Sequence, residues 1–121
     1  MVEKHTKDWG YEDWIANTDK YCGKKLFVKK QYRCSIHYHK LKDETFYVQS
    51  GKVYLELENE IIIMNPGDSK RVLPNQKHRF SGLEDSVIFE FSTTHLESDS
   101  YRDTKSGKIP NEEFKEIGGK I

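Results

Sequence analysis

The sequence predicts an all-β protein built as a single small barrel, and three observations support this prediction. The chain has 121 residues, which is close to the commonest size of one domain. Residues 25–94 read as many short runs rich in β-branched and aromatic residues, without the longer period of helices. Turn-forming residues separate these runs at close spacing, as in barrels and sandwiches. The expected strands are residues 25–29, 33–39, 45–49, 52–58, 60–64, 70–73, 78–81 and 86–93.

The segments that flank the barrel core have their own character. Residues 1–20 are polar but contain four large apolar side chains, so we expect a short arm that packs on the barrel or on a partner subunit. These side chains are Trp9, Tyr11, Trp14 and Ile15. Residues 111–118 are expected to form a short helix, with an Asn cap, acidic residues in the first turn and Gly as the stop. We therefore expect one domain over residues 1–121, with its barrel core at about 25–94.

Composition and charge argue against several functions. Basic and acidic residues number 20 each, so no basic face for nucleic acid is expected. No apolar stretch approaches the roughly 20 residues of a membrane span, and residues 1–10 lack the apolar core of a secretory signal. Cys22 and Cys34 are too few for a disulfide framework, and free thiols suit a reducing compartment. We therefore expect a cytoplasmic protein with no nucleic-acid or membrane partner.

The chemistry-bearing pattern is centred on two histidines. Alternate residues of a strand share a face, so His37 and His39 are expected to present their rings side by side. An isolated pair of this kind is more often structural, but Glu44 and His78 each follow an expected turn nearby. Three imidazoles and a carboxylate suit Mn²⁺, Zn²⁺, Fe²⁺, Co²⁺ or Ni²⁺ better than Ca²⁺ or Mg²⁺, and leave positions open for substrate. We expect one divalent metal per chain, with Mn²⁺ as the first candidate.

The surrounding pattern resembles the two signature motifs of the cupin superfamily. It reads His37-x-His39-x₄-Glu44-x₆-Gly51, followed by Gly67-x₆-Pro74-x₃-His78. The resemblance implies a jelly-roll barrel, also described as a double-stranded β-helix, whose two motifs supply the metal ligands. Two turn positions depart from the usual glycine: Gln31 opens the first motif, and Asn75 stands in the second. Asn tolerates the left-handed backbone conformation better than most residues, so the second departure is mild.

Further segments resemble D-lyxose isomerases and, more distantly, the cupin half of bifunctional mannose-6-phosphate isomerases. They are residues 9–12, 21–25, 33–40, 43–48, 90–95 and 99–102. This resemblance implies a metal-dependent aldose–ketose isomerase that acts on a free or phosphorylated sugar through an enediol intermediate. It also implies that Glu90 is the base that shuttles the proton and that Lys42 assists as a nearby cation.

The sequence alone leaves the placement of several residues open. A turn lysine such as Lys42 is more often exposed to solvent. Residues 87–91 are apolar on both sides of Glu90, so strand parity does not decide whether Glu90 faces outward or into the cavity. The family pattern favours the cavity. His95 lies either at the barrel mouth or on the surface, and His5 is expected to be a mobile terminal residue.

Strand parity also makes predictions about the residues around the ligands. Arg33 and Ser35 share the parity of His37 and are expected to line the cavity, where Arg33 would pair with an anionic group of the substrate. Residues 34, 36 and 38 are expected to face the opposite way.

Several functions are compatible with such a metal-binding barrel. The first is the sugar isomerase, and the second is an enzyme that epimerises or otherwise modifies an activated sugar in polysaccharide synthesis. The third is a non-catalytic sugar-binding or regulatory module that keeps its metal, and an iron dioxygenase is a further alternative. The expected ligand is a sugar or sugar phosphate. The resemblance also implies a homodimer, in which the aromatic arm covers edge strands.

Overall fold

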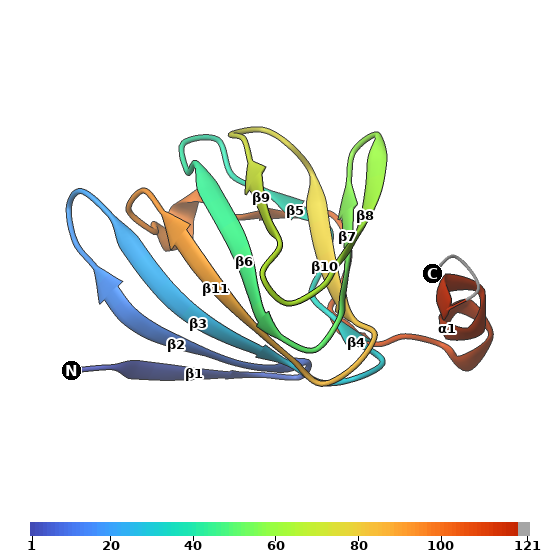
Figure 1. Cartoon of the computed structure of the whole chain (residues 1–121). Coiled ribbons are helices and arrows are strands. Elements are labelled where there is room, and N and C mark those ends of the chain that lie inside the picture. The colour runs from blue at the N-terminus through green and yellow to red at the C-terminus, as the bar shows by residue number, and fades with distance from the viewer. Residues whose placement is uncertain (119–121) are drawn as a thin grey trace.

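The computed structural model describes residues 1–118, and its strands form two sheets with one short helix outside them (Figure 1). The first sheet is antiparallel and has six strands in the order β1-β2-β3-β11-β6-β9. Its strands are β1 Glu3–Lys7, β2 Gly10–Asn17, β3 Cys22–Val28, β6 Glu44–Ser50, β9 Ser69–Val72 and β11 Ser86–Ser92. The predicted all-β architecture is confirmed.

The second sheet is organised around β10, which pairs with β4, β5 and β7. Its strands are β4 Tyr32–Arg33, β5 His37–Tyr38, β7 Val53–Leu57, β8 Glu60–Met64, β10 His78–Gly82, β12 Tyr101–Arg102 and β13 Gly107–Lys108. A 3₁₀ turn, η1 Glu97–Asp99, precedes β12. The strands from β3 to β11 correspond to the eight runs expected from the sequence, with the run at 33–39 divided in two.

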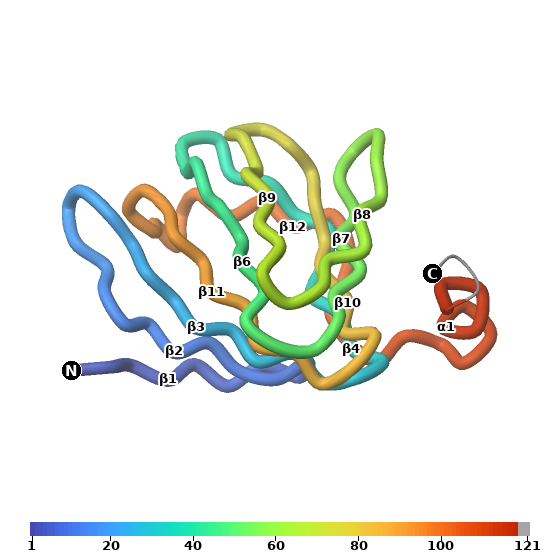
Figure 2. Tube along the Cα trace, viewed as in Figure 1, coloured from blue at the N-terminus to red at the C-terminus, as the bar shows by residue number. Residues whose placement is uncertain are grey.

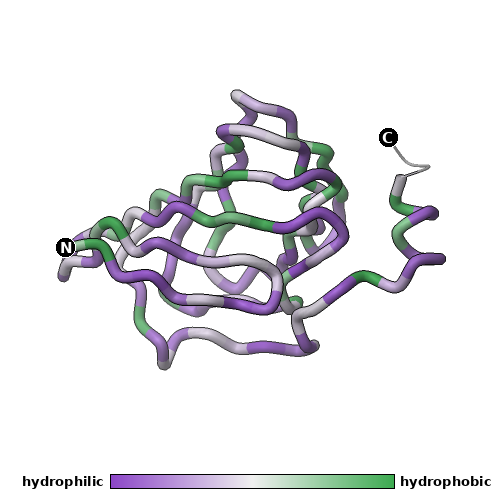
Figure 3. The backbone as a smooth tube through the Cα atoms, turned by 90° about the horizontal axis from the view of Figure 1, so that it is seen from below, coloured by the Kyte–Doolittle hydropathy of each residue, from purple (hydrophilic) through white to green (hydrophobic). Residues whose placement is uncertain are grey.

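The interior between the sheets has an apolar end and a polar end. Alternate residues of β3, β6 and β11 are buried, as the two-residue period of a strand requires, and Figure 3 shows hydrophobic and hydrophilic segments alternating along the strands. At one end the buried side chains are Leu26, Val28, Val48 and Ile88. At the other end of the same strands they are Lys24, Glu44 and Glu90. The apolar end forms the core, and the polar end provides the walls of a cavity.

The N-terminal arm is part of the first sheet and does not merely pack against it. Strand β1 pairs with β2, and β2 pairs with β3, so the arm extends the sheet and forms its edge (Figure 2). The expectation of a mobile His5 is wrong, because its ring stacks on Trp14 with centroids 4.0 Å apart. Trp9 packs edge-on against Phe80 of the second sheet and is buried. The arm's aromatic residues therefore connect it to both sheets.

The run at 33–39 is interrupted, and this changes which way its residues face. Residues 34–36 lie between β4 and β5 outside regular strand geometry. As a result, the prediction that Cys34 points away from the cavity, toward a second sheet, the N-terminal arm or a dimer partner, is wrong, because Cys34 is one of the residues that line the cavity. Cys34 is buried in the core, and its sulfur accepts a bond from the backbone N–H of Phe80. Both cysteines are free and buried, as the sequence suggested.

Two turns use left-handed backbone at the positions where the motifs depart from glycine. Gln31 has φ of 70° and Asn75 has φ of 69°. Gln31 is held there by its side-chain amide, which donates to the Ile109 carbonyl and to the side chain of Asn111. These contacts offset the strain that a residue with a Cβ has in this conformation. The backbone thus keeps the turn geometry without the glycines.

Helix α1 Asn111–Gly118 agrees with the predicted range and lies outside the barrel (Figures 1 and 2). Its Ile117 belongs to a small apolar cluster with Tyr54, Leu83 and Ile109. The predicted domain runs to residue 121, and its last three residues lie outside the described residues. Within residues 1–118, no helix has the length and apolar character needed to cross a membrane.

Candidate metal centre and active site

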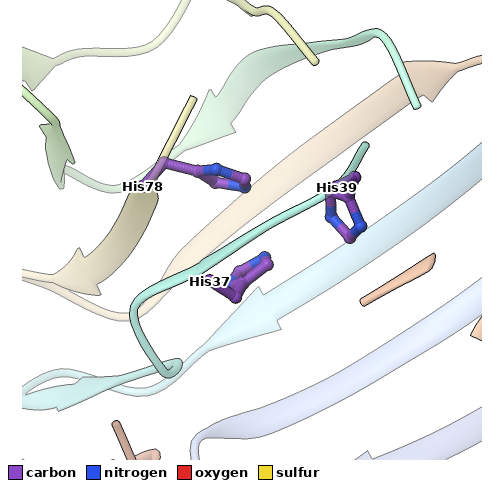
Figure 4. A group of neighbouring side chains, drawn as sticks. All are labelled: His37, His39 and His78. Carbon is purple, nitrogen blue, oxygen red and sulfur yellow. The ribbon is translucent and has the colours of Figure 1, made fainter. Parts of the chain in front are cut away.

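Three histidines, from β5, from the residue just after β5 and from β10, converge at the polar end of the interior (Figure 4). His37 on β5 lies directly opposite His78 on β10 in the ladder, and His39 follows β5 by one residue. Each offers one ring nitrogen, and the three nitrogens lie within 4.8 Å of one another. The antiparallel pairing of β5 with β10 therefore brings together histidines that are about forty positions apart in the sequence. The structure positions these three residues to bind a divalent metal.

The backbone fixes the tautomer of all three rings. The Nδ1 atoms of His37, His39 and His78 lie 2.7, 2.9 and 2.9 Å from the carbonyl oxygens of residues 35, 99 and 76. A carbonyl oxygen can only accept, so each Nδ1 carries the proton and each Nε2 keeps its lone pair. Such outer contacts orient metal-binding histidines in known sites. The rings are thus set with their ligating nitrogens available.

Glu44, the fourth predicted ligand, lies beside the histidines but outside the group whose ligand atoms all lie within 4.8 Å of one another. It begins β6 and is buried, with its Oε2 3.4 Å from His39 Nε2 and 3.6 Å from His78 Nε2. Within residues 1–118, Glu44 Oε2 and His78 Nε2 are buried with no hydrogen-bond partner. When Glu44 is ionised, the lone pairs of these close atoms repel one another, and either a bound cation or the proton that a raised pKa leaves on Glu44 relieves this repulsion. The donor set of three nitrogens and one oxygen therefore fits a transition-metal ion.

Burial shifts the pKa values of the three histidines and of Glu44. Burial is the main reason that the pKa of His37 falls to about 3 and those of His39 and His78 fall to about 4. Burial, followed by the negative charge of Glu90, raises the pKa of Glu44 to about 8. All three imidazoles are accordingly neutral near pH 7, which is the form that binds metal.

Glu90 and Lys42 form a buried ion pair in the wall of the same cavity. Glu90 on β11 is 5% exposed and faces inward, which answers the question that strand parity left open. Lys42 is 3% exposed, so the expectation of a solvent-exposed turn lysine is wrong. Its Nζ lies 2.6 Å from Glu90 Oε2 and 3.1 Å from Nδ1 of His95. His95 therefore lines the cavity rather than the outer surface.

The charges of this pair stabilise each other. Burial alone would raise the pKa of Glu90, but the ammonium groups of Lys42 and Lys24 outweigh it and lower the pKa to about 2. Burial alone would lower the pKa of Lys42, yet the carboxylates of Glu90 and Glu44 raise it. At neutral pH the cavity wall thus presents a carboxylate and an ammonium in direct contact.

Asp99 is a buried carboxylate that was not among the functional residues predicted from the sequence. Its two oxygens accept bonds from the backbone N–H groups of residues 40, 41 and 42, and its carbonyl accepts from Nδ1 of His39. One residue therefore holds both a candidate metal ligand and the loop that carries Lys42 into the cavity. The partners are almost sixty residues apart, so local sequence patterns do not reveal them.

A second buried ion pair was also not predicted from the sequence. Lys24 on β3 is 3% exposed, and its Nζ lies 3.2 Å from Oε1 of Glu12 on β2. Glu12 also accepts a bond from Nε1 of Trp14. Lys24 pairs with Glu90 in the strand register, so the two ion pairs lie on adjacent strands. The alternation of Cys22, Lys24 and Leu26 along β3 was the signal that could have placed Lys24 inside.

One cavity of about 510 Å³, a volume suited to a small-molecule ligand, lies at this site. His37, His39, Glu44, Lys42 and Glu90 line it, whereas His78 is not part of its lining. Ser35 lines it, as predicted from strand parity. The prediction for Arg33 is wrong: this residue is not part of the lining, and its guanidinium forms an ion pair with Glu113 of helix α1. The break in the strand at residues 34–36 separates Arg33 from the parity of the ligands.

Comparison with known proteins gives consistent matches. The model of the Cupin domain family matches residues 26–94. The chain is 32% identical over 124 residues to the D-lyxose/D-mannose isomerase of Thermosediminibacter oceani, covering 78% of this chain and 68% of that protein. It is 32% identical over 127 residues to the D-lyxose ketol-isomerase of Cohnella laeviribosi, covering 81% and 70%. An RmlC-like cupin structure from Shewanella frigidimarina superposes with a TM-score of 0.73 at 16% identity, over 81% of this chain and 88% of that one, which shows a shared fold.

Proposed function

Since this chain belongs to the cupin family, as its motifs predicted, we propose that it is a metal-dependent aldose–ketose isomerase acting on a free or phosphorylated sugar. One observation carries the proposal. Three histidines converge with ligand nitrogens within 4.8 Å of one another, and two of them, His37 and His39, line the same cavity as a buried Lys42–Glu90 pair. The curated relatives are named as isomerases of D-lyxose and D-mannose, which supports this class of reaction.

The proposed ligands are His37, His39, Glu44 and His78, and Mn²⁺ is the proposed ion. When bound, the ion would polarise the sugar carbonyl and stabilise negative charge on its oxygen. The carbonyl contacts at Nδ1 hold the three neutral imidazoles in place, with each Nε2 free to bind.

Glu90 is the proposed base. Isomerisation moves one proton between C1 and C2, so a single carboxylate can take the proton from one carbon and return it to the other. The carbon loses its proton to Glu90, the C–H electron pair forms the C1–C2 double bond, and the carbonyl π electrons move to the oxygen, which gains a proton to give the enediol. The hydroxyl on the other carbon then loses its proton and becomes the new carbonyl as Glu90 returns its proton to the neighbouring carbon. Glu90 is ionised at neutral pH and can therefore accept the proton.

Lys42 is proposed to assist the movement of the second proton, between the two sugar oxygens. Its ammonium donates to Glu90 and to Nδ1 of His95. The ammonium can therefore exchange one of these contacts for a sugar oxygen and keep the other. As a cation it also stabilises the negative charge that develops on the sugar oxygens. When Lys42 turns toward the substrate, Glu90 loses the partner that lowers its pKa, and becomes a stronger base.

A screen of sugars in D₂O tests the proposed function. Pentoses, hexoses and their phosphates are incubated with metal-loaded protein, and NMR measures deuterium at C1 and C2. The proposal predicts exchange into at least one sugar under anaerobic conditions, because the enediol takes its returning proton from groups that equilibrate with solvent. A metal-loaded protein that binds a sugar yet exchanges none of its C–H protons would support a sugar-binding module instead. Turnover that requires oxygen would support a dioxygenase.

A further inference from the structure

The rim of the cavity carries three cations that the proposed reaction does not use. Lys7, Arg102 and Lys105 line the same cavity as three of the candidate ligands, His37, His39 and Glu44. Among residues 1–118, none of the three has a carboxylate within 4.0 Å of its cationic nitrogens. Arg102 and Lys105 are exposed and Lys7 is partly buried. Their charges are therefore available to a ligand that enters the cavity.

The rim has a defined position relative to the metal centre. Arg102 on β12 lies opposite His37 in the strand ladder, so it is one strand away from a candidate ligand. The segment that carries Lys105 is fixed to the turn between β1 and β2, because Ser106 Oγ donates to Asp8 Oδ1 at 2.8 Å. The rim cations thus come from two segments that contact each other on one side of the cavity.

The local charge differs from that of the chain as a whole. The chain has a formal charge of zero, whereas the rim contributes three cations and one carboxylate, that of Asp8. Two hydroxyl groups, those of Ser100 and Thr104, line the same region. Thr104 Oγ1 accepts from the backbone N–H of Ile36, so its own proton is free to be donated. Cations combined with hydroxyl donors are the groups that bind phosphate and carboxylate oxygens.

The rim residues also lie outside the segment that the Cupin domain model matches. The Cupin domain match covers residues 26–94 and includes the four candidate ligands, Lys42 and Glu90. Residues 7–8 and 100–106 lie on either side of that range. The shared segment therefore carries the groups proposed for the chemistry, while the flanking segments carry the charges at the entrance.

We infer that this rim selects an anionic sugar, and that a phosphate monoester at the end of the sugar remote from its carbonyl is the group it binds. The inference rests on the proposed function and specifies its substrate class. A phosphate monoester carries a charge of about −2 near neutral pH, which matches the excess of positive charge at the rim. A sugar carboxylate shares this chemistry with a single negative charge. Arg102 takes the role that the sequence suggested for Arg33, whose guanidinium is occupied by Glu113.

Substrate preference in a double variant tests the inference. Deuterium exchange is measured with a hexose 6-phosphate, a hexuronate and the neutral hexose, in wild type and in Arg102→Ala/Lys105→Ala. We expect wild type to prefer the phosphate ester, and the double variant to reduce this preference about tenfold or more, mainly through a higher KM. Lys20→Ala is the matched control, because Lys20 is exposed and lies outside the cavity lining. A preference for the hexuronate that the double variant reduces would identify carboxylate as the bound group and overturn the assignment to phosphate.

A binding measurement separates this inference from the proposed function. Calorimetry with inorganic phosphate should show binding to the wild type and about tenfold weaker binding to the double variant, with unchanged melting temperature and metal content. If that holds while no sugar exchanges deuterium, the anion site stands and the isomerase proposal fails. If the neutral hexose exchanges as fast as its phosphate in both proteins, the isomerase stands and the inference is overturned.

Discussion

The ammonium nitrogen of Lys42 lies 2.6 Å from the Oε2 atom of Glu90, and both side chains are buried in the wall of the cavity that His37 and His39 line. Burying two charges is costly unless they pair closely, and structural needs alone are often met as well by apolar residues. A close pair of this kind next to three inward-facing imidazoles is the arrangement that proton transfer requires. This relationship is the reason for assigning chemistry, rather than only metal binding, to the cavity.

Removal of one histidine should abolish metal binding without unfolding the barrel. His78→Ala removes one of the four proposed ligands, so we expect metal occupancy to fall from about one ion per chain to a small fraction of that. His5→Ala is the control, since this histidine lies in β1 and is not part of the cavity lining. Elemental analysis measures the metal, and circular dichroism checks the fold. Equal occupancy in wild type and His78→Ala would contradict the assignment.

Asp99 should act as a positioning residue for the loop at 40–42. Asp99→Asn keeps the backbone carbonyl that binds His39 but replaces a carboxylate that accepts three backbone N–H groups. We therefore expect metal content to stay near that of the wild type, while deuterium exchange falls about tenfold or more because Lys42 is no longer held. Asp19→Asn is the matched exposed control. A loss of thermal stability with full exchange per folded, metal-loaded chain would indicate a structural role only.

The chain should form a homodimer through the outer face of the first sheet. Tyr11 stacks on Phe27, and Phe89 stacks on Phe91, which is 58% exposed. Aromatic residues gathered on one sheet face favour a self-complementary partner. Light scattering should give twice the chain mass of 14.3 kDa, and Phe91→Glu should shift it toward the monomer. Ile61→Glu, at an exposed apolar residue of the second sheet, is the control. A wild type at the monomer mass at micromolar concentration would refute the prediction.

The pH dependence of stability should reveal the buried thiol of Cys34. Burial raises the pKa of Cys34 from 9.0 to about 12. Between these values the unfolded chain releases the proton and the native chain keeps it, so stability falls as pH rises from about 9 to 12, by about 1 kcal/mol per pH unit. Cys34→Ala should have a shallower slope over this range. Ellman's reagent at pH 8 should detect no thiol in the native protein and both cysteines after denaturation. Identical slopes in wild type and Cys34→Ala would show that the thiol ionises freely in the folded state.

The sequence predicted the fold and the three converging histidines because their signals are local. The histidine pair, Glu44 and His78 stand next to turns whose residue types set the strand boundaries. Parity arguments failed where the chain leaves strand geometry, as at residues 34–36, and this misplaced Cys34 and Arg33. Strand parity did not decide which way Glu90 faces, because both faces of β11 carry apolar residues.

Long-range contacts account for what the sequence could not predict. Lys42 is in a loop that would ordinarily be exposed, and it is buried because Asp99, 57 residues away, binds that loop. The N-terminal strands carry too many charged residues to resemble strands, since one face of an edge hairpin remains in solvent. Each of these features depends on a partner distant in the sequence, which composition and period do not encode.

The central claim is that the Lys42–Glu90 ion pair moves a proton of the sugar. Deuterium exchange by Glu90→Gln tests this claim most directly. Gln keeps nearly the same volume and cannot accept a proton at neutral pH, and Glu90 is not one of the four proposed ligands. The variant should keep its fold and metal, while NMR in D₂O should show exchange at C1 or C2 reduced at least about a hundredfold. Glu58→Gln, at an exposed carboxylate, should exchange like the wild type. A metal-loaded Glu90→Gln protein with near-wild-type exchange would contradict the account.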